Sequence, residues 1–331
     1  MLRYKLLHIY RVLLSLFIIS FTSAQAQVRG DMIMAPHYSV ENGVGVMFAY
    51  TLQQKFTFMG NISSEGSTFV GITANHAAYG GRWHMYYDAF YYASKPYTWG
   101  IGYNNASLDA NKMEHAKQNL TLRAKGLYKL NRNMSAGPLV GYEWIEWEGI
   151  CTSKAFTYGA EGKIDTRDNG SSPAKGIYTL LRQNNYTDFS LRPYYATTLQ
   201  FDAYKEVWDG GVLAADLYGE FAYGAVPVTM LPTIGGTDRM RGYYKGRYRD
   251  NNALSMQIEL RQHVWEMFGA AVWAGAANVW GKGTGFNLKH TLPNAGVGIR
   301  FKMQRNTLLR LDFGIGKNGQ NGFVFGLNEA F

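Results

Sequence analysis

The sequence of 331 residues contains a single cysteine, Cys151, and only eight prolines. A lone cysteine permits no disulfide bond within the chain, and it has no second thiol for metal binding or redox chemistry. Beyond the first 26 residues, the sequence also lacks any apolar run of the roughly 20 residues that a transmembrane helix requires. These absences exclude a disulfide-stabilised domain and an integral membrane protein built from helices.

Motifs of enzymes are missing as well. Six histidines are scattered along the chain after its first 26 residues, and none belongs to an H-E-x-x-H metal motif: His37, His76, His84, His115, His263 and His290. No G-x-S-x-G nucleophile motif occurs, and the glycine-rich run 281–285 lacks the strand and helix that would make it a phosphate-binding loop. We therefore expect no enzymatic activity, no metal and no cofactor.

The first 26 residues have the organisation of a signal peptide. Arg3, Lys5 and Arg11 surround the start of a short apolar core at 12–19, and the sequence Ala-Gln-Ala at 24–26 is a cleavage motif. A membrane anchor is the alternative, but the apolar core is too short to cross a bilayer. We expect residues 1–26 to be removed on export and residues 27–331 to form the mature protein.

Basic residues outnumber acidic ones, and the formal net charge of the whole chain is +9. Removal of the predicted signal peptide takes away three of these positive charges and leaves +6. In an exported chain, such an excess fits basic side chains that line a lumen or face anionic lipid headgroups. We expect no nucleic-acid partner.

Short segments of alternating apolar and polar residues fill most of the mature chain. In one of them, Val297, Ile299 and Phe301 alternate with Arg300 and Lys302. Such alternation is typical of β-strands with one apolar and one polar face. A soluble sandwich would also produce it, but the predicted export and the many tyrosines favour a membrane barrel with a polar lumen.

We therefore predict an all-β fold, a transmembrane antiparallel β-barrel of about 16 strands formed by residues 27–331. The predicted strands are 31–39, 43–55, 65–77, 82–93, 97–107, 115–130, 134–148, 153–165, 174–184, 188–203, 210–224, 252–264, 268–279, 291–303, 306–315 and 321–331.

Two motifs resemble those of the outer-membrane protein 85 superfamily. The first is Arg241-Gly242-Tyr243 after Gly235-Gly236, followed by the strand residues 258–261 (IELR) and by 274–280 (AGAANVW). The second, upstream of it, is the run 165–169 (DTRDN) with Pro173 and Gly176 behind it. The resemblance extends over the mature chain, and it implies a barrel of 16 strands in the outer membrane of a Gram-negative bacterium.

The resemblance also implies a role for the first motif. In the family, the long connection that carries this motif folds back into the lumen, and its arginine is held by acidic residues on the wall. Carried over here, Arg241 pairs with Glu259, Gly242 allows close backbone approach and Tyr243 stacks on the wall. Many members have a further acid near the position of Gly275, so we expect Glu259 to be the main partner of Arg241. The alternative is an ion pair that only braces the connection.

The second motif marks a periplasmic turn in the family. Asp165, Arg167 and Asp168 would form this turn, and Pro173 and Gly176 would open the next strand. Ordinary turn chemistry explains the same residues without any further function, and we favour that structural interpretation.

The sequence ends in an alternating segment with Phe323, Phe325, Leu327 and Phe331 on one predicted face. A final aromatic residue after such a strand resembles the recognition signal of outer-membrane barrels. Glu329 departs from that pattern, because its position is usually apolar.

The resemblance implies a function in inserting proteins into the outer membrane, or in moving protein or lipid across it, through a seam between the first and last strands. Expected partners are the lipid bilayer, unfolded outer-membrane client proteins and accessory periplasmic or surface proteins of the envelope. The first predicted strand begins so close to the cleavage site that no periplasmic client-binding (POTRA) module fits before it. The alternative function is a passive pore or a structural subunit of an envelope complex.

Overall fold

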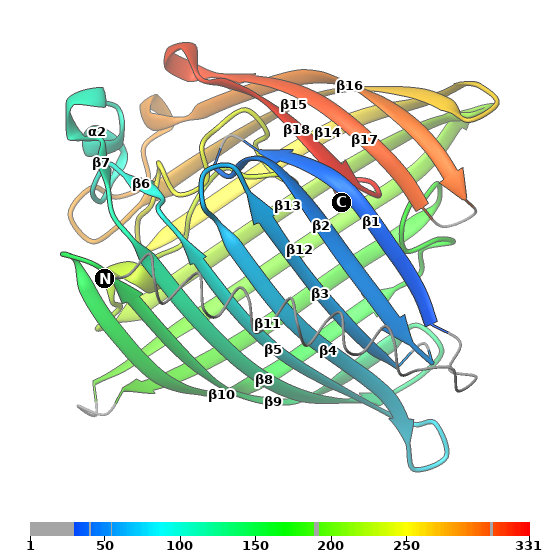
Figure 1. Cartoon of the computed structure of the whole chain (residues 1–331), viewed down its shortest axis with the longest axis horizontal. Helices are drawn as coiled ribbons and strands as arrows, with labels where there is room; N and C mark the ends of the chain where they lie inside the picture. Colours follow the sequence, from blue (N-terminus) through cyan, green and yellow to red (C-terminus); the bar gives the residue numbers. More distant parts are fainter. Residues whose placement is uncertain (1–29, 40, 54, 189–191, 305–306) are drawn as a thin grey trace.

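The chain forms a closed β-barrel of antiparallel strands (Figure 1). The computed structural model describes residues 30–331 except 40, 54, 189–191 and 305–306, so the predicted signal peptide lies outside the described residues. The barrel strands are β1 (Gly30–Ser39), β2 (Gly43–Leu52), β3 (Phe56–Ser63), β4 (Thr68–Ala78), β5 (Trp83–Ser94), β8 (Lys117–Lys129), β9 (Met134–Trp147), β10 (Cys151–Asp165), β11 (Gly176–Asp188), β12 (Pro193–Trp208), β13 (Gly211–Gly224), β14 (Asn252–Trp265), β15 (Phe268–Trp280), β16 (Leu292–Gln304), β17 (Thr307–Gly316) and β18 (Asn321–Leu327). The predicted all-β barrel of 16 strands is confirmed.

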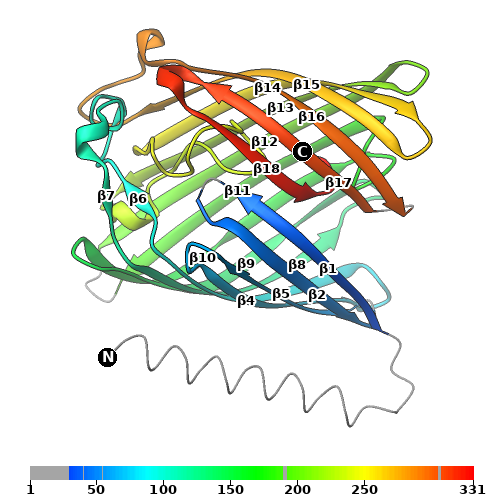
Figure 2. The ribbon, with the colours of Figure 1, turned by 45° about the horizontal axis from the view of Figure 1, so that its top comes forward.

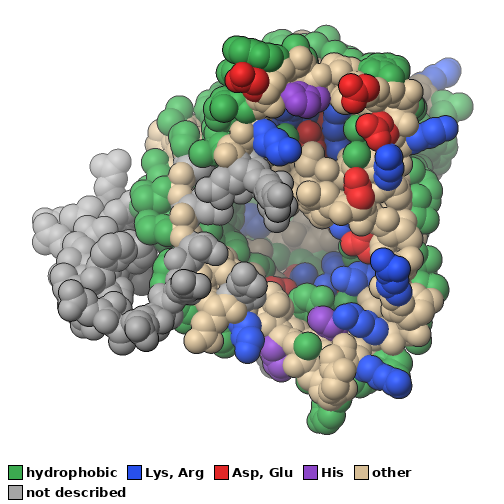
Figure 3. All heavy atoms as spheres, turned by 90° about the vertical axis from the view of Figure 1, so that its right-hand side faces the viewer, with side chains coloured by type: hydrophobic (Ala, Val, Ile, Leu, Met, Phe, Trp, Pro, Cys, Tyr) green, Lys and Arg blue, Asp and Glu red, His purple; other side chains and the backbone are tan. Residues whose placement is uncertain are grey.

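Apolar side chains face outward and polar side chains face the lumen. In β14, Met256 and Ile258 are 55% and 59% exposed on the outer face, whereas Gln257 and Glu259 are almost completely buried inside. Figure 3 views the end of the barrel that lies to the right in Figure 1, and it shows hydrophobic side chains around the rim and charged ones around a central hollow. This distribution is that of a barrel whose outer wall meets lipid. Within the described residues, no helix is long and apolar enough to cross a membrane.

Two predicted strands were wrong, and their errors cancel in the count. The predicted strand 43–55 ends at Leu52, and β3 (Phe56–Ser63) follows it where no strand was expected. The reversal takes place at Gln53, which has a φ of 50°, so no glycine or proline announces the turn. The predicted strand 97–107 is a connection instead, because Gly100 and Gly102 have φ values of 85° and 86° and break the extended backbone.

That connection, residues 95–116, is called the cap here. It contains the short strands β6 (Tyr97–Thr98) and β7 (Met113–Glu114), the single helical turn α2 (Tyr103–Ala106) and the 3-10 turn η1 (Asp109–Asn111). Figures 1 and 2 show it at the end of the barrel opposite to the start of β1.

The prediction for the last strand was also wrong. β18 ends at Leu327, and Asn328 has a φ of 63°, which turns the following residues out of the strand. Phe331 therefore does not share an outer face with Phe323. It is buried with Ala330 against Tyr204 and Ala214, whose side chains face the lumen.

The two strands that close the barrel are joined by very little pairing. Among the described residues, Tyr38 and Phe325 form the one register pair between β1 and β18. On its other edge, β1 pairs with β2 along its whole length, from Gly30 with Leu52 to Ser39 with Gly43. Most of one edge of β1 is thus left without a ladder partner in the described part of the chain.

Candidate functional site in the barrel lumen

The connection between β13 and β14, residues 225–251, folds back into the barrel and is called the lumen loop here. Figure 2 shows it inside the ring of strands. Its two arms run side by side, because Ile234 donates its N–H to Tyr248 and Thr233 forms a β-bridge with Arg249. At the turn, Gly235 has a φ of 99°, and a Cβ there would lie 2.6 Å from the carbonyl oxygen of Tyr243. This position therefore requires glycine.

Arg241, near the tip of the lumen loop, is completely buried against the barrel wall. One terminal nitrogen of its guanidinium pairs with Glu259 on β14, and the other donates to Asp312 on β17 at 2.6 Å. The guanidinium also lies 3.6 Å from the ring centroid of Trp273 on β15. On β16, the side-chain amide of Asn294 donates to the Arg241 carbonyl oxygen at 2.5 Å. Four neighbouring strands thus hold a single residue of the loop.

Glu259 pairs with Arg241 as expected, and Asp312 supplies a second carboxylate that the sequence did not indicate. The position near Gly275 has no room for an acid, because a Cβ there would lie 2.8 Å from the Gln257 side chain. The missing acid is therefore replaced from a different strand, β17, which brings its carboxylate to the other side of Arg241.

Arg241 belongs to a buried group of four arginines, the arginine cluster, whose other members Arg261, Arg300 and Arg310 come from β14, β16 and β17. Four carboxylates face them: Glu259, Asp312, Glu329 and Asp238. Three of these carboxylates are buried with the arginines, whereas Asp238 is 56% exposed. Ion pairing of this kind offsets the cost of burying charged side chains.

The backbone next to Arg241 touches the wall directly. Gly242 has a φ of 101°, and a Cβ on it would lie 2.5 Å from the backbone of Gly314 on β17. Tyr243 follows, and its hydroxyl donates to the Pro293 carbonyl at 2.5 Å and accepts the N–H of Lys317 at 2.7 Å. Burial raises the pKa of Tyr243 to about 12, so the hydroxyl remains protonated at neutral pH.

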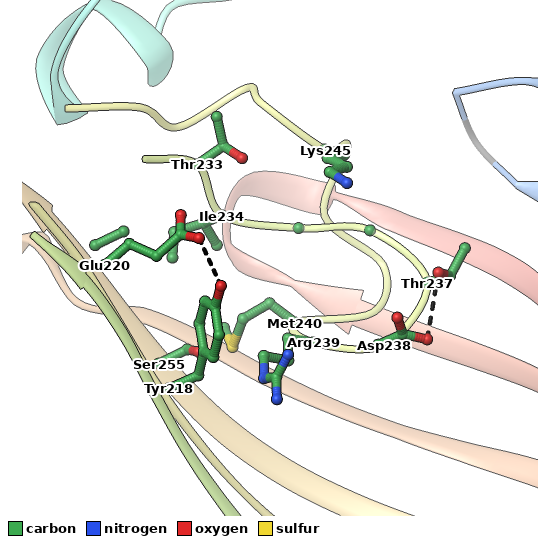
Figure 4. A pocket seen from close by; sticks show the side chains of 13 residues that line it. Tyr218, Glu220, Thr233, Ile234, Thr237, Asp238, Arg239, Met240, Lys245 and Ser255 are labelled. Carbon is green, nitrogen blue, oxygen red and sulfur yellow. Dashed lines mark hydrogen bonds between the residues drawn. The ribbon is translucent and has the colours of Figure 1, made fainter. Parts of the chain in front are cut away.

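A second arginine of the loop binds an adjacent part of the wall. Arg239 holds Asp216 on β13 through two of its nitrogens, at 2.8–3.0 Å. A cavity of about 240 Å³ lies between this side of the loop and strands β13 and β14. In Figure 4, the hydroxyl of Tyr218 on the wall points to Glu220 across its floor, and Arg239 reaches down from the loop.

The base of the lumen loop binds the cap. Arg247 donates to the carbonyl oxygen of Ala106 at 2.9 Å and pairs with Asp109 at 2.8 Å. The N–H of Gly102 donates to Arg249, and Tyr244 accepts the N–H of Tyr97. Arg247 and Arg249 thus connect the base of the loop to the cap.

The 165–169 motif forms a turn at the opposite end of the barrel. The Arg167 side chain donates twice to Asp165, at 2.9 Å each, and Asp168 accepts the N–H groups of Ala174 and Lys175. Gly176 has a φ of 106°, and a Cβ on it would lie 2.4 Å from the Thr166 carbonyl. Pro173 lines a small cavity there, together with Arg261 and Arg300. The hydrogen bonds of Asp165, Arg167 and Asp168 are local turn contacts.

Several residues of the site were not predicted as partners. Arg300, Arg310 and Asp312 lie in the predicted strands 291–303 and 306–315, but alternation shows which face of the sheet a residue is on and not which residue it contacts. Glu329 was read as a departure from a terminal signal, yet it pairs with Arg300 at 2.9 Å.

Comparison with known proteins agrees with this architecture. The Omp85 superfamily domain matches residues 44–331. The structure of BamA from Haemophilus ducreyi lacking POTRA domains 1–3 aligns with a TM-score of 0.69 at 13% identity, over 91% of this chain and 70% of that one. CdiB from Acinetobacter baumannii and CdiB from Escherichia coli each align with a TM-score of 0.61 at 11% identity. These alignments cover 91% and 92% of this chain but only 65% and 63% of the CdiB chains, which is less than two thirds. No curated protein matches the sequence.

The closed barrel with a connection anchored in its lumen defines an integral outer-membrane protein of Gram-negative bacteria. The chain belongs to the Omp85 superfamily, and the resemblance seen in the sequence is confirmed. Its place is accordingly among the barrels concerned with outer-membrane protein assembly and transport.

Proposed function

We propose that this barrel inserts proteins into the outer membrane, or moves them across it, by opening laterally between β1 and β18. The observation that carries the proposal is the seam, where Tyr38 and Phe325 form the one register pair among the described residues. Backbone N–H and C=O groups without partners are costly in lipid, so the free edge of β1 favours the addition of a strand from another chain.

The contacts of the lumen loop favour a lumen that opens and closes over a lumen that is permanently open. Arg241 is bound by two buried carboxylates, and the cap covers the base of the loop. A passive pore, the alternative function, needs no such fastening of a loop across its lumen. No contact in the described part of the chain specifically favours a purely structural subunit.

The orientation follows from the lengths of the connections. The longest ones, 95–116, 225–251 and 281–291, all lie at one end of the barrel, and the other end has mostly short turns. Outer-membrane barrels carry short turns on the periplasmic side and long loops outside. We infer that the end with the 165–169 turn faces the periplasm, where client proteins and accessory envelope proteins would approach it.

A reversible cross-link of the seam tests the proposal. In a Cys151→Ser background, Tyr38→Cys with Phe325→Cys places two thiols on directly opposed residues, whose Cα atoms are close enough for a disulfide. Val46→Cys with Ile62→Cys is the matched control, because this pair lies on the outer face between β2 and β3. The variants would replace the native protein in its own bacterium. The amount of folded outer-membrane protein would be measured by gel electrophoresis with and without heating, because folded barrels change their mobility on heating.

We expect the oxidised seam variant to lose most of this assembly activity and to regain it on reduction. The oxidised control should remain active, because its disulfide joins two strands that are already paired. Full activity of the oxidised seam variant would overturn lateral opening and would favour the passive pore or the structural subunit.

A further inference from the structure

The residues after β18 are joined through Arg300 to the two acids that hold the lumen loop. This post-β18 segment, 328–331, turns into the lumen at Asn328. The N–H of Glu329 then donates to the Ser171 carbonyl at 3.0 Å, and Ala330 and Phe331 are buried against the inner wall. Two groups of the segment reach the arginine cluster. The Phe331 carbonyl oxygen accepts a hydrogen bond from Arg261 at 3.0 Å, and the Glu329 side chain, which is 4% exposed, pairs with Arg300.

Arg300 lies at the centre of this contact, and each of its three guanidinium nitrogens binds a different carboxylate. Its Nε pairs with Glu329 at 2.9 Å, its Nη1 with Asp312 at 2.5 Å and its Nη2 with Glu259 at 3.3 Å. Glu259 and Asp312 are the two acids that hold Arg241. Arg241 takes one oxygen of each carboxylate, and Arg300 takes the other.

The other arginines of the cluster lack this combination. Arg261 lies 3.6 Å from Glu329 and 2.8 Å from Glu259, but no described contact joins it to Asp312. Arg310 binds Asp312 and Asp238 and makes no described contact with Glu329. Among the described ion pairs, Arg300 is thus the residue that joins the end of the seam strand to both acids of the loop.

We propose that Arg300 is a positioning residue that couples the post-β18 segment to the lumen loop, so that withdrawal of Glu329 from the lumen loosens the grip on Arg241. The physical reason is charge balance. When Glu329 leaves, Arg300 is drawn onto Glu259 and Asp312, and it then competes with Arg241 for the same carboxylates. The inference deepens the proposed function, because it connects movement of β18 at the seam with release of the loop.

The test measures the loop while the segment is perturbed. The full chain would carry Cys151→Ser and a spin label at Thr237→Cys, an exposed position at the loop tip, in lipid nanodiscs. We expect Glu329→Gln to raise the ratio of mobile to immobile label at least about fivefold, the lower end of the range for coupled sites. In an Arg300→Lys background, Glu329→Gln should add no further change, because lysine keeps the charge but cannot bind three carboxylates in one plane.

Arg310→Lys is the matched control, and Glu329→Gln should keep its full effect in that background. An equal effect in the Arg300→Lys background, or no effect in the wild type, would overturn the proposal. Heat-modified mobility would show that every variant is folded. The measurement needs no client protein, so its failure is separate from failure of the seam cross-link, which concerns activity.

Discussion

At the scale of single residues, Arg241 makes the main contacts that attach the tip of the lumen loop to the barrel wall. Its guanidinium has two carboxylate partners and an aromatic face, and its carbonyl oxygen is bound as well. Removal of one partner from a buried ion pair typically costs about 3–5 kcal/mol, because the remaining charges stay buried without compensation. The loss of Arg241 would mainly destabilise the position of the loop, because Glu259 and Asp312 remain paired with other arginines.

Arg241→Ala should therefore open the lumen without unfolding the barrel. We expect the purified wild type to be nearly closed in planar lipid bilayers and the variant to show larger, steadier ion conductance. Arg241→Lys is the matched comparison, because it keeps the charge and should give an intermediate result. Equal, large conductance of all three proteins would mean that the loop does not close the lumen.

Gly242→Ala should have a similar effect although it removes no charge. The added Cβ would meet the backbone of Gly314 at 2.5 Å, and the φ of 101° is strained for alanine. The tip would have to move away from β17, and this takes Arg241 with it. Gly283→Ala is a suitable control, since a Cβ there meets nothing within 4 Å. Conductance like that of the wild type in Gly242→Ala would show that the close approach is dispensable.

Sequence patterns predicted only some of the residues of this site. The resemblance of the triplet at 241–243 to the family motif implied an arginine held by an acid of the wall and gave Glu259 as its partner, and alternation placed Glu259 on the inner face of its strand. Asp312 is separated from Arg241 by 71 residues, and its place beside it depends on how four strands are staggered. Alternation gives the face of a strand but not this stagger, so the second acid could not be assigned.

At the scale of elements, the cap and the lumen loop behave as partners. The cap has little regular structure of its own, with two short strands and one helical turn. Its order comes from contacts with Arg247, Arg249 and Tyr244 of the loop. A segment of this kind opens locally at a low free-energy cost when its tertiary contacts are lost.

Arg247→Ala should accordingly expose the cap to proteolysis. We expect trypsin to cut after Lys112, an exposed residue of the cap, several times faster in this variant than in the wild type. Asp109→Asn should change the rate little, because Asp109 is 82% exposed and Arg247 keeps its bond to Ala106. Equal cleavage of the wild type and Arg247→Ala would show that the cap is held by its other contacts alone.

The strand predictions failed where local backbone conformation decided the outcome. The turn at Gln53 carries no glycine or proline, so the predicted strand ran on to residue 55 and β3 was missed. The segment 97–107 alternates well enough to resemble a strand, yet Gly100 and Gly102 take left-handed conformations there. The end of β18 depends in a similar way on Asn328, a residue type that tolerates a positive φ.

At the scale of the whole molecule, the barrel was predictable because its physics is repeated in every strand. A long chain without spanning helices, with apolar and polar residues in alternation, has few ways to satisfy its backbone in lipid other than a closed sheet. The asymmetry of the barrel was harder to predict from the sequence. Its weak seam lies between the first and last strands of the sequence. The pairing register of this seam cannot be predicted from the pattern of either strand alone.

The cap has a consequence for the cell that carries this barrel. The lumen loop is bound at two separate places, by the wall acids through Arg241 and by the cap through Arg247. Loss of either contact alone leaves the loop attached at the other, so we expect small solutes to meet an obstructed lumen unless both contacts are released together.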